Sequence, residues 1–203
     1  MANIAGDNPY NRFMTKLFNI VELNVLWLIT CIPVLTIGDA TSAMYFVMLK
    51  MVKNEEGVIY KDYFRFFKEN FRKSIPYTLW LLLVTGILTF DLHVTKAGIS
   101  YGGLIVLVIV AVCIFSYVWA LFASYDNTVR GTFNNAWRLM ATHLPQSLAI
   151  LAIQVIPFLW LILKPESFAR VFWIWFFVGA GAACYVSSLL LRPVMDEIRP
   201  EET

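Results

Sequence analysis

Three polar side chains lie inside the first apolar run of the sequence, residues 17–37: Asn19, Glu22 and Asn24. A carboxylate near the centre of a membrane-spanning helix costs about 2.5–3.5 kcal/mol, so such a residue tends to face the protein interior and to have a function. Helical geometry places Asn19 one turn before Glu22 and turns Asn24 about 140° away from Asn19. The three residues are a candidate polar site, with Glu22 as a proton-linked carboxylate. In the alternative, Glu22 snorkels to the interface and pairs with Lys16.

Other residue types that carry chemistry are sparse. The cysteines Cys31, Cys113 and Cys184 each lie inside an apolar run, no Cys-x-x-Cys motif occurs, and only His93 and His143 are available. Neither a metal site nor a disulfide framework is expected from this pattern. The sequence also has no nucleophile elbow, zinc-binding HExxH helix or phosphate-binding loop. We therefore expect no enzyme activity, no catalytic residue and no cofactor.

Residues 58–73 carry two stripes at helical spacing. The aromatic stripe is Tyr60, Phe64, Phe67 and Phe71, and the basic stripe, one position on, is Lys61, Arg65, Lys68 and Arg72. Such a helix is typical of the membrane interface, with its aromatic face towards acyl chains and its basic face towards anionic lipid or a partner protein. In residues 128–142, apolar residues recur with the same helical spacing, at Val129, Phe133, Ala136 and Met140.

Small residues mark the last apolar run. Gly179, Gly181 and Ala183 give it a face on which another helix can approach closely. That helix belongs either to this chain or to another subunit. Asp39, after the first run, is expected to cap the helix that follows.

The elements that position these residues follow from composition. Of the 203 residues, 59% are hydrophobic and 15% are charged, against about 45–50% and 25% in soluble domains. We expect an all-α, polytopic membrane protein. Apolar runs at 17–37, 40–52, 75–90, 104–122, 147–163 and 171–191 predict five or six transmembrane helices, because 40–52 is short for a span.

Positive charge favours six spans over five. With six, both termini and the segments around residues 60 and 135 lie on one side, which then holds 13 of the 16 Lys and Arg residues. With five, the division is 11 to 5. Because cytoplasmic loops carry the excess of Lys and Arg, we predict six spans, cytoplasmic termini and two cytoplasmic interfacial amphipathic helices.

The chain is expected to form a single transmembrane domain, residues 1–203, that contains a possible internal repeat. A shift of 69 residues superposes 40–90 on 109–159 and brings Phe64 onto Phe133, Pro76 onto Pro145 and Leu79 onto Leu148. Each copy would contain a span, an interfacial helix that ends before a proline, and a second span opened by that proline. The alternative to a duplication is that the two segments resemble each other because both enter the membrane in the same way.

The stretch from Leu17 to Lys50 resembles the opening of the YesL-like family of bacterial membrane proteins. The matching features are Phe18-Asn19, Leu23-Asn24, Leu26-Trp27, Ile32-Pro33, Thr36-Ile37-Gly38 and Ala43-x-Tyr45, supported by Asn8-Pro9-Tyr10. Asp39 departs from the pattern, since a small uncharged residue is expected there. The resemblance implies a Gram-positive cytoplasmic-membrane protein encoded beside carbohydrate ABC importers, and it assigns no catalytic or binding residue.

Three functional hypotheses follow. The first is an accessory or regulatory subunit that contacts the permease subunits of an oligosaccharide ABC importer. The second is a small transporter or permease, although few polar residues would lie mid-membrane and the chain is short for a permease. The third is a scaffold whose basic stripe binds anionic lipid. Nucleic acid is not an expected partner.

Overall fold

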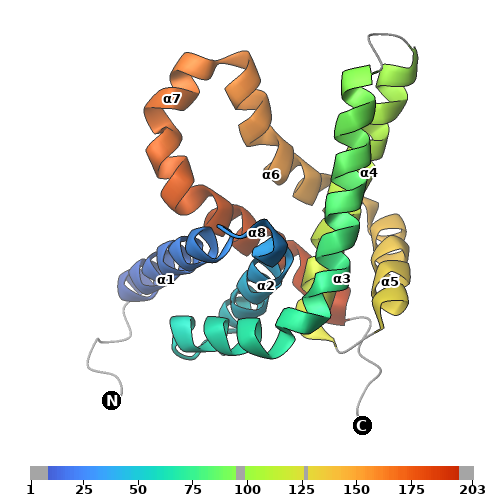
Figure 1. The fold of residues 1–203 in the computed structure, drawn as a ribbon. Coiled ribbons are helices and arrows are strands. Elements are labelled where there is room, and N and C mark those ends of the chain that lie inside the picture. Colours follow the sequence, from blue (N-terminus) through green and yellow to red (C-terminus); the bar gives the residue numbers. More distant parts are fainter. Residues whose placement is uncertain (1–8, 95–98, 126–127, 197–203) are drawn as a thin grey trace.

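The computed structural model describes residues 9–94, 99–125 and 128–196, and every regular element in those ranges is helical (Figure 1). The predicted all-α class is therefore confirmed. The elements in chain order are α1 (Pro9–Thr30), the 3₁₀ turn η1 (Val34–Thr36), α2 (Ile37–Lys53), α3 (Ile59–Val94), α4 (Ile99–Ser124), α5 (Val129–Thr142), α6 (Leu144–Leu163), α7 (Pro165–Ile174), the π-helical segment η2 (Trp175–Gly179) and α8 (Ala180–Asp196).

Four stretches are long and apolar enough to cross a membrane: Tyr10–Thr30, Leu107–Ser124, Leu144–Leu161 and Pro165–Met195. They correspond to four of the six predicted spans, so the protein is a polytopic helical membrane protein. The remaining two predicted spans, 40–52 and 75–90, lie in α2 and in the second half of α3. Neither is among the four found in the described ranges, and the count of six stays a prediction.

Helix α2 lies at the centre of the molecule and contacts α1, α3, α4 and α8. Gly38, Ala43 and Met48 are all buried, and at about 100° per residue they point to three different sides of the helix. A helix that is apolar on all sides is stable only when other helices enclose it. This enclosure explains how a helix of 17 residues forms part of the fold.

The connection between α1 and α2 comes earlier than residue 37, where the first apolar run was predicted to end. Helix α1 ends at Thr30, and both Gly38 and Asp39 lie in the first turn of α2. Pro33 accounts for the difference, because a proline disfavours helical conformation in the residue before it. Within the 3₁₀ turn that follows, the Thr36 hydroxyl donates to the Thr30 carbonyl and satisfies one end of α1.

Helix α3 runs through Pro76 as one helix of 36 residues. The prediction that an interfacial helix ends before this proline is wrong for the first copy of the repeat. Instead, α3 bends, and Figure 1 shows its first part running across the base of the molecule before its second part rises beside α4. Proline removes one backbone hydrogen bond and kinks a helix without having to end it. In the second copy, α5 and α6 do separate, at His143.

Three fully buried tyrosines connect the helices across the core: Tyr63, Tyr77 and Tyr117. The Tyr77 hydroxyl lies 3.1 Å from Thr132 Oγ1 on α5, and the Tyr117 hydroxyl lies 2.8 Å from Ser147 Oγ on α6. A buried phenol needs a hydrogen-bond partner. These pairs therefore fix α3 to α5 and α4 to α6.

Candidate functional site

The first half of α3, residues 59–74, is anchored to the protein by a face that neither predicted stripe contains. Ile59, Tyr63 and Phe66 on this face are buried. The Phe66 ring stacks on Phe46 of α2, with centroids 4.6 Å apart. Burial raises the pKa of the Tyr63 phenol, whose oxygen lies 2.5 Å from Thr30 Oγ1. These contacts hold the helix against both α1 and α2.

An ionic contact fixes the start of the same helix. The Asp62 carboxylate accepts from Lys50 Nζ of α2 at 3.3 Å and from Arg65 at 2.8 Å. Lys50 Nζ also lies 4.5 Å from the centre of the Phe46 ring. Because Tyr63 approaches the Ala40 carbonyl while Asp62 pairs with Lys50, residues 59–74 contact α2 towards both of its ends.

The predicted stripes remain on the outside of α3. We call seven side chains the α3 outer surface, since all of them are exposed: Tyr60, Lys61, Phe64, Arg65, Lys68, Phe71 and Arg72. Phe67, the remaining member of the aromatic stripe, is half-buried. Over the part of the chain that the structure describes, Lys61, Lys68 and Arg72 form no ion pair. The surface therefore combines apolar rings with cations that a lipid or a protein could neutralise.

The polar residues of α1 do not come together as one site. Glu22 is exposed, Asn19 is half-buried and Asn24 is completely buried. Asn24 Nδ2 donates to the Phe176 carbonyl at 2.8 Å, and the Gly181 amide donates to Asn24 Oδ1 at 2.8 Å. A π-helical segment disturbs the regular backbone ladder, and Asn24 supplies partners at η2 and at the start of α8. Its contacts are structural.

The small residues of the last run lie beside α1 and within η2. A Cβ at Gly181 would come within 2.9 Å of the Ile20 carbonyl oxygen, so this glycine permits α1 and α8 to approach each other. A Cβ at Gly179 would overlap the ring of Trp175 in the same segment. Ala183 is half-buried. At Gly181 the neighbouring helix belongs to this chain.

Asp39 is the acidic residue that the core encloses, and the expectation that it caps a helix is wrong. Its residue exposure is 0%, and neither carboxylate oxygen has a hydrogen-bond partner. The Ser74 hydroxyl approaches the carboxyl but donates to the Phe71 carbonyl at 2.8 Å. Helix α2 begins at Ile37, earlier than expected, which turns Asp39 into the core. The sequence signal for this buried carboxylate was its position directly between two apolar runs, 17–37 and 40–52.

No group of three or more His, Cys, Asp or Glu side chains within residues 9–94, 99–125 and 128–196 is arranged to hold a metal ion. His93 lies on α3, but its side chain is outside the described part of the structure. The three cysteines carry free thiols.

Comparison with known proteins gives one match. Residues 20–92 match the model of a family described as a protein of unknown function, DUF624. The matched region contains the second half of α1, all of α2 and nearly all of α3, and so includes the α3 outer surface, Asn24 and Asp39. No curated protein and no solved structure matches the chain.

Proposed function

We propose that this protein is a non-catalytic accessory subunit of a bacterial carbohydrate ABC importer, held in the cytoplasmic membrane against the permease subunits. The observation that carries the proposal is the α3 outer surface. A helix fixed by Ile59, Tyr63 and Phe66 presents three exposed rings and four exposed cations on its remaining sides. Aromatic and Arg side chains are enriched at protein interfaces, and a preformed helix loses little conformational freedom on docking.

The kind of partner follows from the family resemblance. Residues Leu17–Lys50 resemble the YesL-like family, whose members carry DUF624, and that family is associated with carbohydrate ABC importers and their solute-binding proteins. The position of the surface agrees with this partner. It lies within the segment that matches the family model, so the part of the chain with a recognisable pattern also presents the exposed rings and cations of α3.

A lipid-binding scaffold is the competing function for the same surface. Anionic head groups would neutralise the four cations, and the exposed rings would enter the acyl region. The two functions differ in what survives purification. A docked subunit retains protein at a fixed stoichiometry, whereas a scaffold retains lipid alone.

The test is affinity purification of the tagged protein from its native host in mild detergent. We expect permease or solute-binding subunits in stoichiometric amount. The variant Lys61→Glu/Lys68→Glu/Arg72→Glu should insert normally and lose them, and it spares the Arg65–Asp62 pair. The matched control is Arg130→Glu/Arg138→Glu on α5, where both cations are also exposed. Wild-type protein that purifies with lipid and no partner would overturn the proposal and favour the scaffold.

A further inference from the structure

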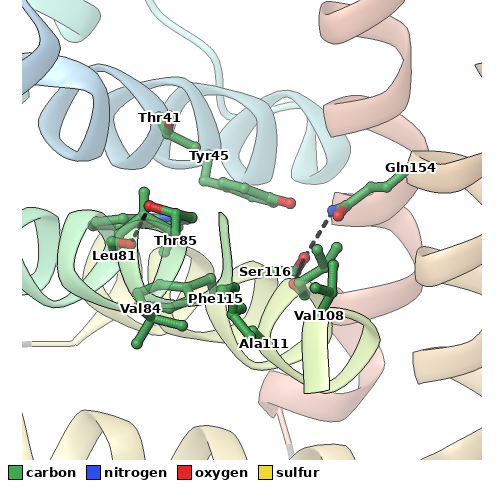
Figure 2. Close-up of a pocket in the computed structure, with 13 residues that line it drawn as sticks. Thr41, Tyr45, Leu81, Val84, Thr85, Val108, Ala111, Phe115, Ser116 and Gln154 are labelled. Atoms are coloured by element: carbon green, nitrogen blue, oxygen red, sulfur yellow. Dashed lines mark hydrogen bonds between the residues drawn. The ribbon is translucent and has the colours of Figure 1, made fainter. Parts of the chain in front are cut away.

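A partly open cavity of about 280 Å³, with the exposed Thr85 in its wall, lies between α2, the second half of α3, α4 and α6. Most of its wall is apolar, with Leu81 and Val84 from α3 and Val108 and Phe115 from α4 (Figure 2). The cavity is separate from the α3 outer surface, which lies on the first half of that helix. An apolar pocket with a few convergent polar groups is the usual form of a small-molecule site.

Tyr45, Ser116 and Gln154 place their polar atoms towards one end, whereas Thr41 and Thr85 lie away from it and donate to the Ile37 and Leu81 carbonyls of their own helices (Figure 2). Gln154 Nε2 of α6 donates to Ser116 Oγ of α4 at 2.7 Å, and Ser116 Oγ donates in turn to the Val112 carbonyl at 2.7 Å. This arrangement fixes the Gln154 amide while using only one of its two N–H groups, and its carbonyl oxygen is still able to accept. Figure 2 shows the Tyr45 ring extending across the cavity with its hydroxyl towards Gln154.

The lining restricts the charge of any occupant. None of the residues around the cavity is Asp, Glu, Lys, Arg or His. A charged group transferred into such surroundings would lose its hydration without gaining a counter-ion. The occupant is therefore neutral, with a hydrogen-bonding group at the Gln154 end and apolar atoms elsewhere.

The volume restricts its size. An engineered apolar cavity of about 150 Å³ in another protein binds benzene, which has six non-hydrogen atoms. This cavity, at about 280 Å³, is close to twice as large. It would accept a molecule of roughly ten to twelve non-hydrogen atoms by the same scaling.

We propose that this cavity binds one uncharged amphiphile of that size, whose hydroxyl or amide head bonds Gln154 and Tyr45 and whose chain lies along Leu81, Val84 and Phe115. The site goes beyond the proposed function and does not depend on it. Binding would occur within a single subunit, whether or not a partner is docked on α3.

The probe is 10-bromo-1-decanol, because bromine quenches indole fluorescence on contact and Trp119 lines the cavity. Purified protein in phospholipid nanodiscs is titrated, and the Trp119→Phe variant is subtracted to isolate the signal of that indole. We expect saturable quenching that 1-decanol reverses and decanoate does not. Gln154→Leu should weaken binding roughly threefold to tenfold, the equivalent of one hydrogen bond.

Ala111→Phe, which fills the cavity from α4, should abolish the saturable component. Circular dichroism and elution volume check that each variant folds. If Ala111→Phe does not fold, Gln154→Leu and the decanoate competition decide the result. Quenching that rises linearly, or that is the same with and without Trp119, overturns the site. Saturable quenching by brominated phospholipid that decanol cannot displace also overturns it, since the occupant would then be a lipid chain.

Discussion

The residues of α3 align with those of α5 and α6 after a shift of 69 positions. The backbone conformation before the proline nevertheless differs between the two segments. At Pro76 the helix bends and continues, whereas before Pro145 it stops at His143, which has φ −113° and ψ 55°. Ser74, the counterpart of His143, is buried and stays helical, with its hydroxyl bonded to Phe71. The comparison shows that a proline permits a break in a helix without requiring one.

The two segments also differ in what they present. Phe64 on α3 is exposed, whereas its counterpart Phe133 on α5 lies against Tyr77, Trp80 and Phe115. The four cations of α3 correspond to Arg130, Asn134, Trp137 and Ala141. Residues with the same helical spacing therefore pack against other helices in α5 but face outwards in α3. The difference arises because burial depends on which helices are adjacent.

The largest expected effect separates the two phenylalanines. Phe133→Ala should lower the free energy of unfolding by about 3 kcal/mol, since it removes a ring that contacts three other aromatic residues. Phe64→Ala removes a single edge-to-face contact, with Tyr63, and should lower it by about 1 kcal/mol. Denaturant titration in mixed micelles measures both. Equal losses at the two positions would contradict the assignment of Phe64 to an outer surface.

The next effect concerns Asp39, whose counterpart after the same shift is Val108. Asp39→Asn removes a buried charge that has no hydrogen-bond partner, so we expect a gain of about 2 kcal/mol at pH 8. The gain should disappear at acidic pH, where the wild-type carboxyl is protonated and neutral. Glu22→Gln, at an exposed position of α1, is the control and should change stability little at either pH. A loss of stability in Asp39→Asn at pH 8 would show that the carboxylate has a partner.

The smallest effect compares two interhelical hydrogen bonds, one between residues 40–90 and 109–159 and one within 109–159. Tyr77→Phe removes the bond from α3 to Thr132, and Tyr117→Phe removes the bond from α4 to Ser147. Each variant should lose about 1 kcal/mol and leave a buried hydroxyl with one partner fewer. Thermal unfolding midpoints, measured at a fixed detergent concentration, check this. An effect in only one of the two variants would indicate that the two contacts are not equivalent.

Much of the architecture could be predicted because composition and apolar run length determine where helices form in a membrane. The run at 171–191 falls within a stretch that the structure also gives as long and apolar enough to span, and the run at 17–37 overlaps the first such stretch, Tyr10–Thr30. The break after α1 and the bend in α3 could not be placed. Both depend on local conformation around Pro33 and Pro76, and a proline is compatible with more than one outcome.

The candidate site was only partly accessible from the sequence. Helical spacing identified the stripes around Lys61 and Phe64. It could not reveal the buried face of the same helix, because Tyr63 and Phe66 lie next to the stripe residues in the sequence and are aromatic too. Gln154 and Tyr45 are 109 positions apart in the chain. Only the packing of α2 against its neighbours brings them to one cavity.

The most direct test of the proposed docking is photocrosslinking from two equivalent, exposed positions. Lys68 on α3 and Trp137 on α5 are related by the shift of 69 residues, and both side chains lie on the surface. Each is replaced by p-benzoylphenylalanine in the native host, which is then irradiated. The proposal predicts a crosslink to an ABC permease subunit from position 68 and none from position 137. Crosslinks of equal yield from both positions, or none from position 68, would contradict it.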